Sequence, residues 1–385
     1  MGQNGNGKRI LILTVTGAHG DAHRRMANAL RQALLQIQPD DTVEVVDALQ
    51  QCATWFHLYY DSYLIPAKYC PPLWRWIENL QHGSRATTPG WVYRRGGQGL
   101  FRFIQTFNPD VVVATEVGLC ELTSMCKREA YSRFRLVGLC TGVDMDRAWA
   151  QPEVDLYPIA PDAAGALEAA GAPRAKILPC GMPIDPAFAC RCEQAAARTR
   201  LKIEPDVPMV LVLFGGRGFG KPHLILKELQ KVKAPLQVVL ITGKDPRVEE
   251  KVRRLCTGRA RHTVLGWVDN MHEWICAADL LVAKAGGSTV IEALAGGLPI
   301  LAFDFFPGSE ERTCAWIAKE GLGWWIRRPE EIAPVIEHML NDPAELQRLR
   351  AKAKAKGRPR AAFEAAEAIL KLAHSGSPAD TAHSG

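Results

Sequence analysis

Residues 279–305 read DLLVAKAGGSTVIEALAGGLPILAFDF, and this stretch decides the fold. An apolar run over 280–283 leads into the turn Gly286-Gly287, a helical pattern follows to residue 295, and a second apolar run begins at Leu298. Two short apolar runs joined through a helix are typical of a βαβ unit, whose parallel strands are buried on both faces. The stretch therefore predicts part of a parallel sheet that helices cover.

The same unit recurs along the chain in two series, which predicts an α/β protein with two doubly wound sheets. The apolar runs of the first series lie at 9–16, 42–49, 110–117, 134–140, 154–160 and 175–180. A proline-punctuated stretch interrupts the pattern before a fresh series starts at residue 209. We therefore expect an amino-terminal domain over 1–202, a carboxy-terminal domain with closing helices over 203–372, and a disordered tail over 373–385.

Composition narrows the class of protein. The chain has 385 residues, 47% hydrophobic and 23% charged, which is typical of a globular protein. Its net charge of +6 is mildly basic and decides nothing alone, and the phosphate- and sugar-binding motifs described below argue against a nucleic-acid partner. No run of 18 apolar residues occurs, so we expect a protein that is soluble or bound to a membrane surface. The 11 scattered cysteines are typical of free thiols in a reducing cytoplasm, and Cys190 and Cys192 lack the second pair that a zinc site needs.

Four glycine-bearing turns follow predicted strands, at 17–20, 215–220, 286–287 and 308. Glycine lets the main chain approach an anion closely, although tight strand-to-helix turns need glycine in any case. The turn at 286–287 carries more weight, because Ser288 and Thr289 open a helix there and its amide groups and dipole favour an anion. Glu292, one turn further on, either caps this helix end or accepts hydrogen bonds from a ribose diol.

The turn at Gly308 repeats this arrangement. Pro307 and Gly308 follow an apolar run, and Ser309, Glu310 and Glu311 then open a helix. Adjacent acids in a first helical turn stabilise the helix dipole without any ligand. They also supply the acceptors that sugar hydroxyls need, so the turn suits a sugar beside the phosphates.

The segment VLGWVDNMHEWICAADLLVAKAGGSTVIEALAGGLPIL, followed by PGSEERTCAWIAKEGLG, resembles a known family. This is the monogalactosyldiacylglycerol synthase and processive diacylglycerol glucosyltransferase family, itself similar to the MurG-type GT-B glycosyltransferases. GDAH at 20–23 stands where the family has a Gly-rich loop ending in His, and CGMPIDPAF at 180–188 matches its GIP turn. The likeness covers most of residues 8–340 and is densest after 208.

The resemblance implies a GT-B fold, in which two Rossmann-like domains face a central cleft. It also implies a UDP-sugar held mainly by the second domain and a lipid acceptor held by the first. The donor residues that it implies are Gly215 and Gly216 at the nucleotide phosphates, Gly266, Trp267, Val268 and Met271 around the uracil, Gly287, Ser288 and Thr289 at the diphosphate, Glu292 at the ribose, and Ser309, Glu310 and Glu311 at the hexose. It implies no metal or other cofactor, since helix N-termini and loop amides would stabilise the leaving UDP.

The chain departs from the family pattern in several places. Ser309 stands where the family usually has Gln, and Thr313 where it has Asn, so the hexose is not predicted. TGVDMDRAW at 141–149 resembles a TD…H..W pattern but has Gly142 for the Asp and Asp146 for the His.

Glycosyl transfer needs a base that takes the proton of the attacking hydroxyl. His23 is the first candidate, because a position at a helix start keeps an imidazole neutral near pH 7. The alternative is a histidine that only caps or lines this loop. Asp21 is a second candidate for the base, and Asp146 is a weaker candidate in the place of the family's histidine.

Between residues 52 and 107, aromatic side chains are interleaved with basic ones. This mixture suits a membrane interface, although aromatic residues at helical spacing are also typical of a core. The acceptor or membrane surface that we predict comprises Trp55, Tyr59, Tyr63, Lys68, Trp74, Arg75, Trp91, Arg94 and Arg95. We expect residues 81–99 to form a loop over the acceptor site.

We therefore predict an inverting transferase that moves galactose or glucose from a UDP-sugar to diacylglycerol or a related lipid. It would act as a peripheral protein on the cytoplasmic face of the membrane, with anionic lipid as a candidate activator. Three other interpretations stay open: transfer of N-acetylglucosamine to an isoprenoid-linked precursor, a UDP-sugar epimerase, and a catalytically impaired homologue that binds lipid or nucleotide.

Overall fold

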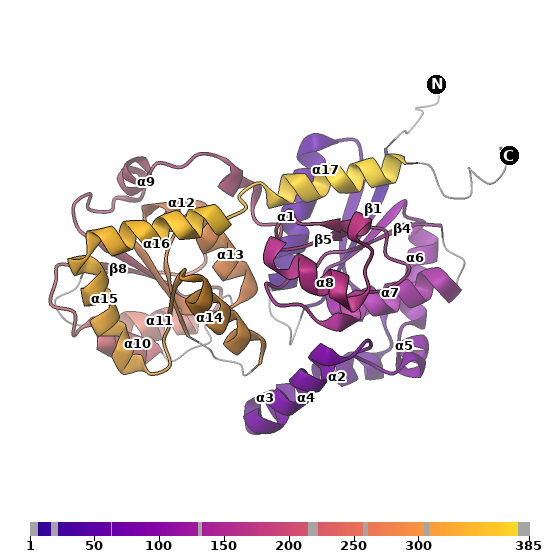
Figure 1. The fold of residues 1–385 in the computed structure, drawn as a ribbon, viewed down its shortest axis with the longest axis horizontal. Coiled ribbons are helices and arrows are strands. Elements are labelled where there is room, and N and C mark those ends of the chain that lie inside the picture. Colours follow the sequence, from indigo (N-terminus) through magenta and orange to yellow (C-terminus); the bar gives the residue numbers. More distant parts are fainter. Residues whose placement is uncertain are drawn as a thin grey trace. The chain divides into compact units, whose positions relative to one another are not determined.

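The structure is a computed structural model that describes residues 7–16, 22–62, 64–129, 133–214, 222–256, 261–303 and 308–375. These residues form two compact units (Figure 1). Unit 1 takes the described residues up to Pro186 and those from Arg360 onward, and unit 2 spans Ala187–Pro359. Each unit is a parallel sheet with helices, so the predicted α/β class is confirmed.

Unit 1 is built on a parallel sheet in the order β2-β1-β3-β4. Its strands are β1 (Arg9–Thr14), β2 (Thr42–Asp47), β3 (Val111–Ala114) and β4 (Arg135–Gly138), and the short parallel pair is β5 (Tyr157–Pro158) and β6 (Ile177–Leu178). Its helices are α1 (Ala22–Ile37), α2 (Thr54–Asp61), α3 (Leu64–Tyr69), α4 (Pro71–Gly83), α5 (Gly90–Gly96), α6 (Gln98–Phe107), α7 (Val117–Glu129), α8 (Ala164–Ala170) and α17 (Ala361–His374), with 3-10 turns η2 (Ala48–Gln51), η3 (Arg147–Trp149), η4 (Pro161–Ala163) and η5 (Arg174–Lys176).

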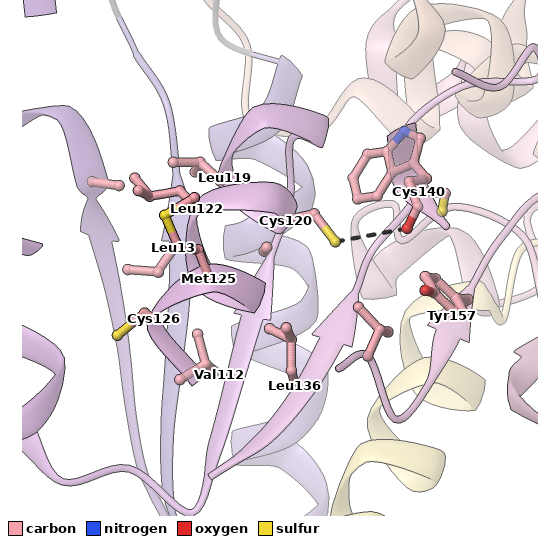
Figure 2. Packing of buried hydrophobic residues seen from close by; sticks show 14 of the residues in the cluster. Leu13, Val112, Leu119, Cys120, Leu122, Met125, Cys126, Leu136, Cys140 and Tyr157 are labelled. Atoms are coloured by element: carbon pink, nitrogen blue, oxygen red, sulfur yellow. Dashed lines mark hydrogen bonds between the residues drawn. The ribbon is translucent and has the colours of Figure 1, made fainter. Parts of the chain in front are cut away.

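Alternate residues of each strand pack on opposite faces of this sheet. Leu11 and Leu13 of β1 face one core, whereas Ile10 and Ile12 face the other. Figure 2 shows part of the first core, where strand residues such as Leu13 lie against helix α7. Because both faces are buried, the strands appear in the sequence as continuous apolar runs, which is why they could be predicted.

Helix α17 belongs to unit 1, although the sequence places the closing helices with the carboxy-terminal domain. Its Ala362, Ala366 and Ile369 are buried in the same core as Leu30 of α1. The structural division therefore differs from the predicted boundaries at 203 and 372: residues 187–202 join unit 2, and α17 joins unit 1. An alanine-rich helical pattern predicts a helix, but it does not say against which sheet the helix packs. Most of the predicted tail, 376–385, lies outside the described residues.

Unit 2 is a six-stranded parallel sheet in the order β12-β11-β10-β7-β8-β9. Counted from β7, this is the doubly wound order 3-2-1-4-5-6 read from the β9 edge. Its strands are β7 (Met209–Leu213), β8 (Gln237–Ile241), β9 (Arg261–Leu265), β10 (Leu280–Lys284), β11 (Ile300–Phe303) and β12 (Gly323–Trp325). Its helices are α9 (Gln194–Leu201), α10 (Pro222–Leu229), α11 (Pro246–Leu255), α12 (Met271–Ala277), α13 (Gly287–Ala295), α14 (Ser309–Glu320), α15 (Ile332–Asn341) and α16 (Pro343–Lys356), with η7 at Pro329–Glu331; η6 (Pro186–Ala189) lies at the first crossing between the units.

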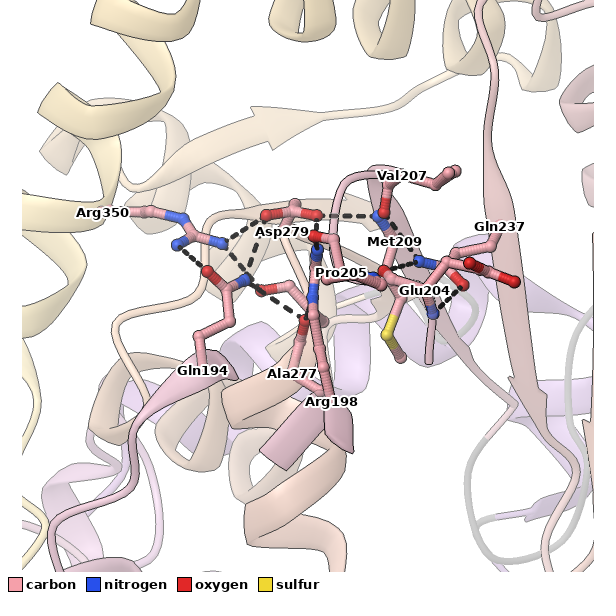
Figure 3. Close-up of polar contacts among 11 residues, drawn as sticks. Gln194, Arg198, Glu204, Pro205, Val207, Met209, Gln237, Ala277, Asp279 and Arg350 are labelled. Atoms are coloured by element: carbon pink, nitrogen blue, oxygen red, sulfur yellow. Dashed lines mark hydrogen bonds and ion pairs between the residues drawn. The ribbon is translucent and has the colours of Figure 1, made fainter. Parts of the chain in front are cut away.

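Asp279, directly before β10, anchors both ends of unit 2 (Figure 3). Arg198 of α9 places Nη2 2.5 Å from Asp279 Oδ2, and Arg350 of α16 places Nη2 2.9 Å from Oδ1. Gln194 and the amide of Met209 donate to the same carboxylate. The half-buried carboxylate thus accepts hydrogen bonds from four residues, which ties α9 and α16 to the sheet.

Cys192 and Cys276 form a disulfide, which joins the segment before α9 to α12. The prediction of free thiols is therefore wrong for these two residues. Their separation of 84 residues explains the error, because only the packing of α9 on α12 brings them together. Cys190 is a free, exposed cysteine.

Candidate active site

His23 lies at the point in unit 1 where the strand order reverses. It is the second residue of α1, which follows β1, and the adjacent β3 ends just before Thr115. His23 Nδ1 lies 2.7 Å from the carbonyl oxygen of Thr115. A carbonyl oxygen can only accept, so Nδ1 carries the hydrogen and Nε2 carries the lone pair. Ligands of such sheets bind at this reversal, so His23 occupies the expected place for a functional residue.

The surroundings of His23 keep its imidazole neutral. Burial lowers the pKa of His23 below its usual value of 6.5, and this effect outweighs the charge of Glu116 and the Thr115 carbonyl, which raise it. A neutral imidazole with a lone pair at Nε2 can accept a proton near pH 7. Asp21, the neighbouring candidate, lies outside the described residues.

Glu116 is a buried carboxylate that sequence reasoning missed. It lies between β3 and α7, is 8% exposed, and accepts hydrogen bonds from the Tyr60 hydroxyl and from the Leu119 amide. Burial and the charge of Glu116 raise the pKa of Tyr60 well above 10, so its hydroxyl stays a donor. An acidic residue directly after the apolar run 110–115 was the available signal, because functional side chains follow the ends of parallel strands.

Glu121, one turn further along α7, was also missed. It accepts hydrogen bonds from the Thr87 amide at 2.9 and 3.1 Å and from the Thr87 hydroxyl at 2.5 Å. Burial raises the pKa of Glu121 to about 8, although the bonds from Thr87 act in the opposite direction. Tyr93, which is buried, shares the Thr87 hydroxyl at 2.9 Å. This cluster fastens the α4–α5 connection to α7.

Asp146 lies in the loop between β4 and η3, as the sequence order implies. Its Oδ1 lies 2.8 Å from Nδ1 of His82, which comes from α4. Residues 81–99 are not a single loop, because α4 continues to Gly83 and α5 occupies Gly90–Gly96. Within this range only the connection 84–89 and Gly97 are free of helix.

Helices α2 to α5 expose a set of large apolar side chains, which we call the apolar helical surface. Its members, with exposed fractions from 41% to 74%, are Trp55, Leu58, Tyr59, Ile65, Tyr69, Leu73, Trp76, Leu80 and Trp91. In contrast, Phe56 and Tyr93 of the same region are buried in the core. The aromatic residues therefore divide between core and surface.

The basic and aromatic residues predicted for this surface differ in how far they are exposed. Trp55, Tyr59 and Trp91 belong to it, Trp74 is partly buried, and Arg75 and Arg95 are exposed. Arg94 pairs with Glu129 at 2.6 Å. Tyr63 and the side chain of Lys68 lie outside the described part of the chain. Within that part, no helix is both long and apolar enough to cross a bilayer.

The donor candidates lie in unit 2, where its own strand order reverses between β7 and β10. Gly287 begins α13 directly after β10, and Ser288 and Thr289 follow in its first turn. Glu292 lies about one turn further and is 3% exposed. This places the amide groups of a helix N-terminus at the reversal, the usual place for a phosphate in such a sheet. Gly215 and Gly216, after β7, lie outside the described residues.

The segment after β9 holds the residues assigned to the uracil. Gly266 follows the strand, and a Cβ there would lie 2.6 Å from Glu249 Oε2, so a larger residue would displace that carboxylate. Trp267 is 41% exposed, its indole donates to Asp269, and the Lys244 ammonium lies 4.3 Å from its ring centroid. Val268 is half-buried beside it, and Met271 opens α12.

The first turn of α14 brings the three hexose candidates together. Ser309 is exposed, whereas Glu310 is 7% exposed and forms an ion pair with Lys284 of β10 at 2.8 Å. Glu311 Oε2 accepts the amide of Gly308, whose φ of +97° favours glycine. Thr313 donates to the Ser309 carbonyl. Both carboxylates thus have partners within the chain, and Lys284 links this turn to the strand before α13.

Comparisons with known proteins agree with this fold. The family model described as "Glycosyl transferases group 1" matches residues 211–342, and the model described as "Monogalactosyldiacylglycerol (MGDG) synthase" matches residues 23–184. The crystal structure of MurG from Acinetobacter baumannii has a TM-score of 0.62 at 15% identity and covers 94% of this chain and 99% of that one. The S. aureus MnaA–UDP structure has a TM-score of 0.60 at 15% identity and covers 96% and 99%.

The fold and these matches define a glycosyltransferase-type protein with the GT-B fold. Over 398 residues the chain is 26% identical to a probable monogalactosyldiacylglycerol synthase of Glycine max, covering 96% of this chain and 74% of the relative. It is 24% identical over 377 residues to a processive diacylglycerol beta-glucosyltransferase of Bacillus mycoides, covering 95% of each chain. The resemblance to the monogalactosyldiacylglycerol synthases and processive diacylglycerol glucosyltransferases is thereby confirmed.

Proposed function

We propose that this chain is an inverting glycosyltransferase that moves galactose or glucose from a UDP-sugar to diacylglycerol or a related lipid. The observation that carries the proposal is the neutral His23 with its hydrogen on Nδ1, at the strand reversal of the same unit that exposes the apolar helical surface. The named relatives act on diacylglycerol, and the synthase model matches a segment that begins at His23.

On the acceptor side, His23 would act as the general base. The acceptor hydroxyl oxygen attacks the anomeric carbon from the face opposite UDP, and the bond between that carbon and the UDP oxygen breaks. The hydroxyl proton moves to Nε2 of His23, whose Nδ1–H stays on the Thr115 carbonyl. Attack from this face converts an α-linked donor into a β-glycoside.

On the donor side, α13 would hold the diphosphate. The first amide groups of a helix have no acceptor within that helix, and those of α13 would stabilise negative charge as UDP leaves. The carboxylate of Glu292 would accept hydrogen bonds from the ribose, and Ser309, Glu310 and Glu311 in the first turn of α14 would contact the hexose. We propose that the protein needs no metal or other cofactor, since these helix dipoles would stabilise the negative charge of the leaving UDP.

The apolar helical surface would seat the protein on the cytoplasmic face of a membrane. Indole and phenol rings favour the headgroup region, and burial of such rings stabilises binding at about 25 cal/mol per Å² of apolar area. Arg75 and Arg95 are exposed in the same helices and would meet anionic lipid, which we propose as an activator.

The test is a donor-by-acceptor screen. The protein is incubated with labelled UDP-galactose, UDP-glucose or UDP-N-acetylglucosamine and vesicles that contain diacylglycerol or an isoprenoid-linked precursor. Thin-layer chromatography then separates the labelled lipids. We expect a β-linked hexosyl-diacylglycerol. Label in the isoprenoid lipid would favour the MurG-like alternative, and conversion of UDP-sugar without lipid would indicate an epimerase. Binding of lipid or UDP without any turnover would show a catalytically impaired homologue.

A further inference from the structure

Two departures from the family pattern, Gly142 and Asp146, lie in the loop 141–149. In the structure this loop meets an imidazole from a different element. Nδ1 of His82 lies 2.8 Å from Asp146 Oδ1, and Nε2 of the same ring lies 3.5 Å from Asp144 Oδ1. A carboxylate accepts, so the ring donates its Nδ1–H to Asp146. An acid–imidazole pair therefore joins this loop to α4.

The helix that carries His82 has two different faces. Leu73, Trp76 and Leu80 of α4 are 45%, 61% and 55% exposed and belong to the apolar helical surface. No described residue of α4 is fully buried, so little apolar packing holds this helix to the rest of unit 1. It does pack against η3, the last turn of the loop 141–149.

We propose that His82 is a positioning residue, which fixes the loop 141–149 through Asp144 and Asp146 and thereby couples the membrane-facing helix α4 to the acceptor site. The proposal rests on the proposed function. His82, Asp144 and Asp146 are 29%, 34% and 36% exposed, so the pair is open to solvent at the same edge of the sheet as His23. A charged hydrogen bond between α4 and the loop makes any displacement of the helix move the loop.

A small change in the position of the loop would be enough to lower the rate of sugar transfer. A displacement of roughly 1 Å at a positioning residue can lower a transfer rate by about 100-fold. An exchange of His82 and Asp146 keeps the same pair of groups between α4 and the loop, with the two positions reversed. A second acid–imidazole pair, His57 with Asp61 in α2 at 3.4 Å, lies within one helix and serves as the matched control.

The experiment compares His82→Ala, the exchange variant His82→Asp/Asp146→His, and His57→Ala, all in the full chain. Initial rates are measured with UDP-galactose and UDP-glucose on vesicles of phosphatidylglycerol and diacylglycerol. We expect His82→Ala to lower kcat by roughly 10- to 100-fold with the donor KM unchanged, the exchange variant to recover most of that loss, and His57→Ala to behave as wild type.

Amide hydrogen exchange supplies a readout that needs no turnover. We expect faster exchange over 71–83 and 141–149 in His82→Ala, and wild-type exchange in the exchange variant and in His57→Ala. Unchanged exchange, an unchanged kcat, or an exchange variant no better than His82→Ala in both assays would overturn the coupling. If the wild-type protein transfers no sugar, the proposed function fails, and hydrogen exchange alone decides whether His82 joins α4 to the loop.

Discussion

The Nζ atom of Lys284 lies 2.8 Å from Oε1 of Glu310, so an ion pair joins the last residue of β10 to the first turn of α14. The pair holds the turn proposed for the hexose next to the turn proposed for the diphosphate. Glu310 is 7% exposed, so the loss of this partner would leave a buried polar group with fewer hydrogen bonds.

Removal of either partner of this pair should destabilise unit 2. We expect Lys284→Met to lower the free energy of unfolding by about 1 to 3 kcal/mol, because the buried carboxylate of Glu310 loses its ion-pair partner. The double variant Lys284→Met/Glu310→Gln should lose less than the sum of the single changes. Urea unfolding of the four proteins measures this coupling, and strictly additive losses would contradict it.

His23 should be required for turnover but not for donor binding. We expect His23→Gln to lower kcat by roughly 100-fold or more, because the acceptor proton loses its base. The affinity for UDP, measured by calorimetry, should match that of wild type. His57→Gln is the control for loss of a surface histidine, and near wild-type turnover of His23→Gln would place the base elsewhere.

The free energy of unfolding should decrease at acidic pH because His23 becomes protonated. Its pKa is lowered in the folded protein, so the unfolded chain takes up this proton first as the pH falls below about 6.5. The stabilisation by neutral His23 is therefore present above 6.5 and lost below it. The pH dependence of urea unfolding should be flatter for His23→Gln between pH 6.5 and 5, and equal slopes would count against the lowered pKa.

Glu121 should make the protein less stable as the pH rises, which is the opposite of the effect of His23. Its pKa of about 8 in the folded protein exceeds the ordinary 4.5, so the folded state holds an extra proton between these values. The contribution of Glu121 should therefore decrease as the pH rises from 4.5 to 8, by at most about 1.4 kcal/mol per pH unit. Glu121→Gln should remove this slope, whereas Glu129→Gln, an exposed change on the same helix, should leave it. A slope that persists in Glu121→Gln would assign it to another group.

Glu292 should contribute to nucleotide affinity. We expect Glu292→Ala to weaken UDP binding by about 1 to 3 kcal/mol, because the ribose loses a charged acceptor. Glu330→Ala, an exposed change in the same unit, is the control. Calorimetry with UDP measures both, and an unchanged affinity of Glu292→Ala would remove its proposed role.

The apolar helical surface should govern membrane binding. We expect Trp76→Ser and Leu80→Ser each to weaken partition into phosphatidylglycerol vesicles by about 1 to 2 kcal/mol, roughly 5- to 30-fold. Trp267→Ser, an exposed tryptophan in unit 2, should bind vesicles as wild type does. Sedimentation with vesicles gives the partition coefficient, and equal losses in all three variants would refute a specific surface.

Much of the fold could be predicted because parallel strands are buried on both faces. The apolar runs at 9–16 and 42–49 correspond to β1 and β2, and only their ends differ. The helical pattern of residues 53–80 predicts helix but not where it breaks, and the structure has three helices there, α2 to α4. Pro71 explains the last break, since proline lacks an amide and favours the first turn of a new helix.

The contacts that sequence reasoning missed join distant elements. His82 and Asp146 are 64 residues apart and come from a helix and a loop, so no local spacing brings them together. Glu116 and Glu121 were missed for a related reason, because only the burial around them sets their hydrogen bonds and the raised pKa of Glu121. In contrast, the position of His23 followed from the order of strand and helix, and the structure adds the Thr115 partner.

The contacts of Asp279 bear on whether unit 2 can be produced as a separate protein. The helix that starts the unit and the helix that ends it both reach this one carboxylate, so the severed ends of an excised piece 187–359 would stay near each other. Such a piece is a natural candidate for expression by itself or for circular permutation through a short glycine linker. Asp279→Asn would weaken the attachment of both helices at once, and the isolated piece should then be more readily digested by proteases.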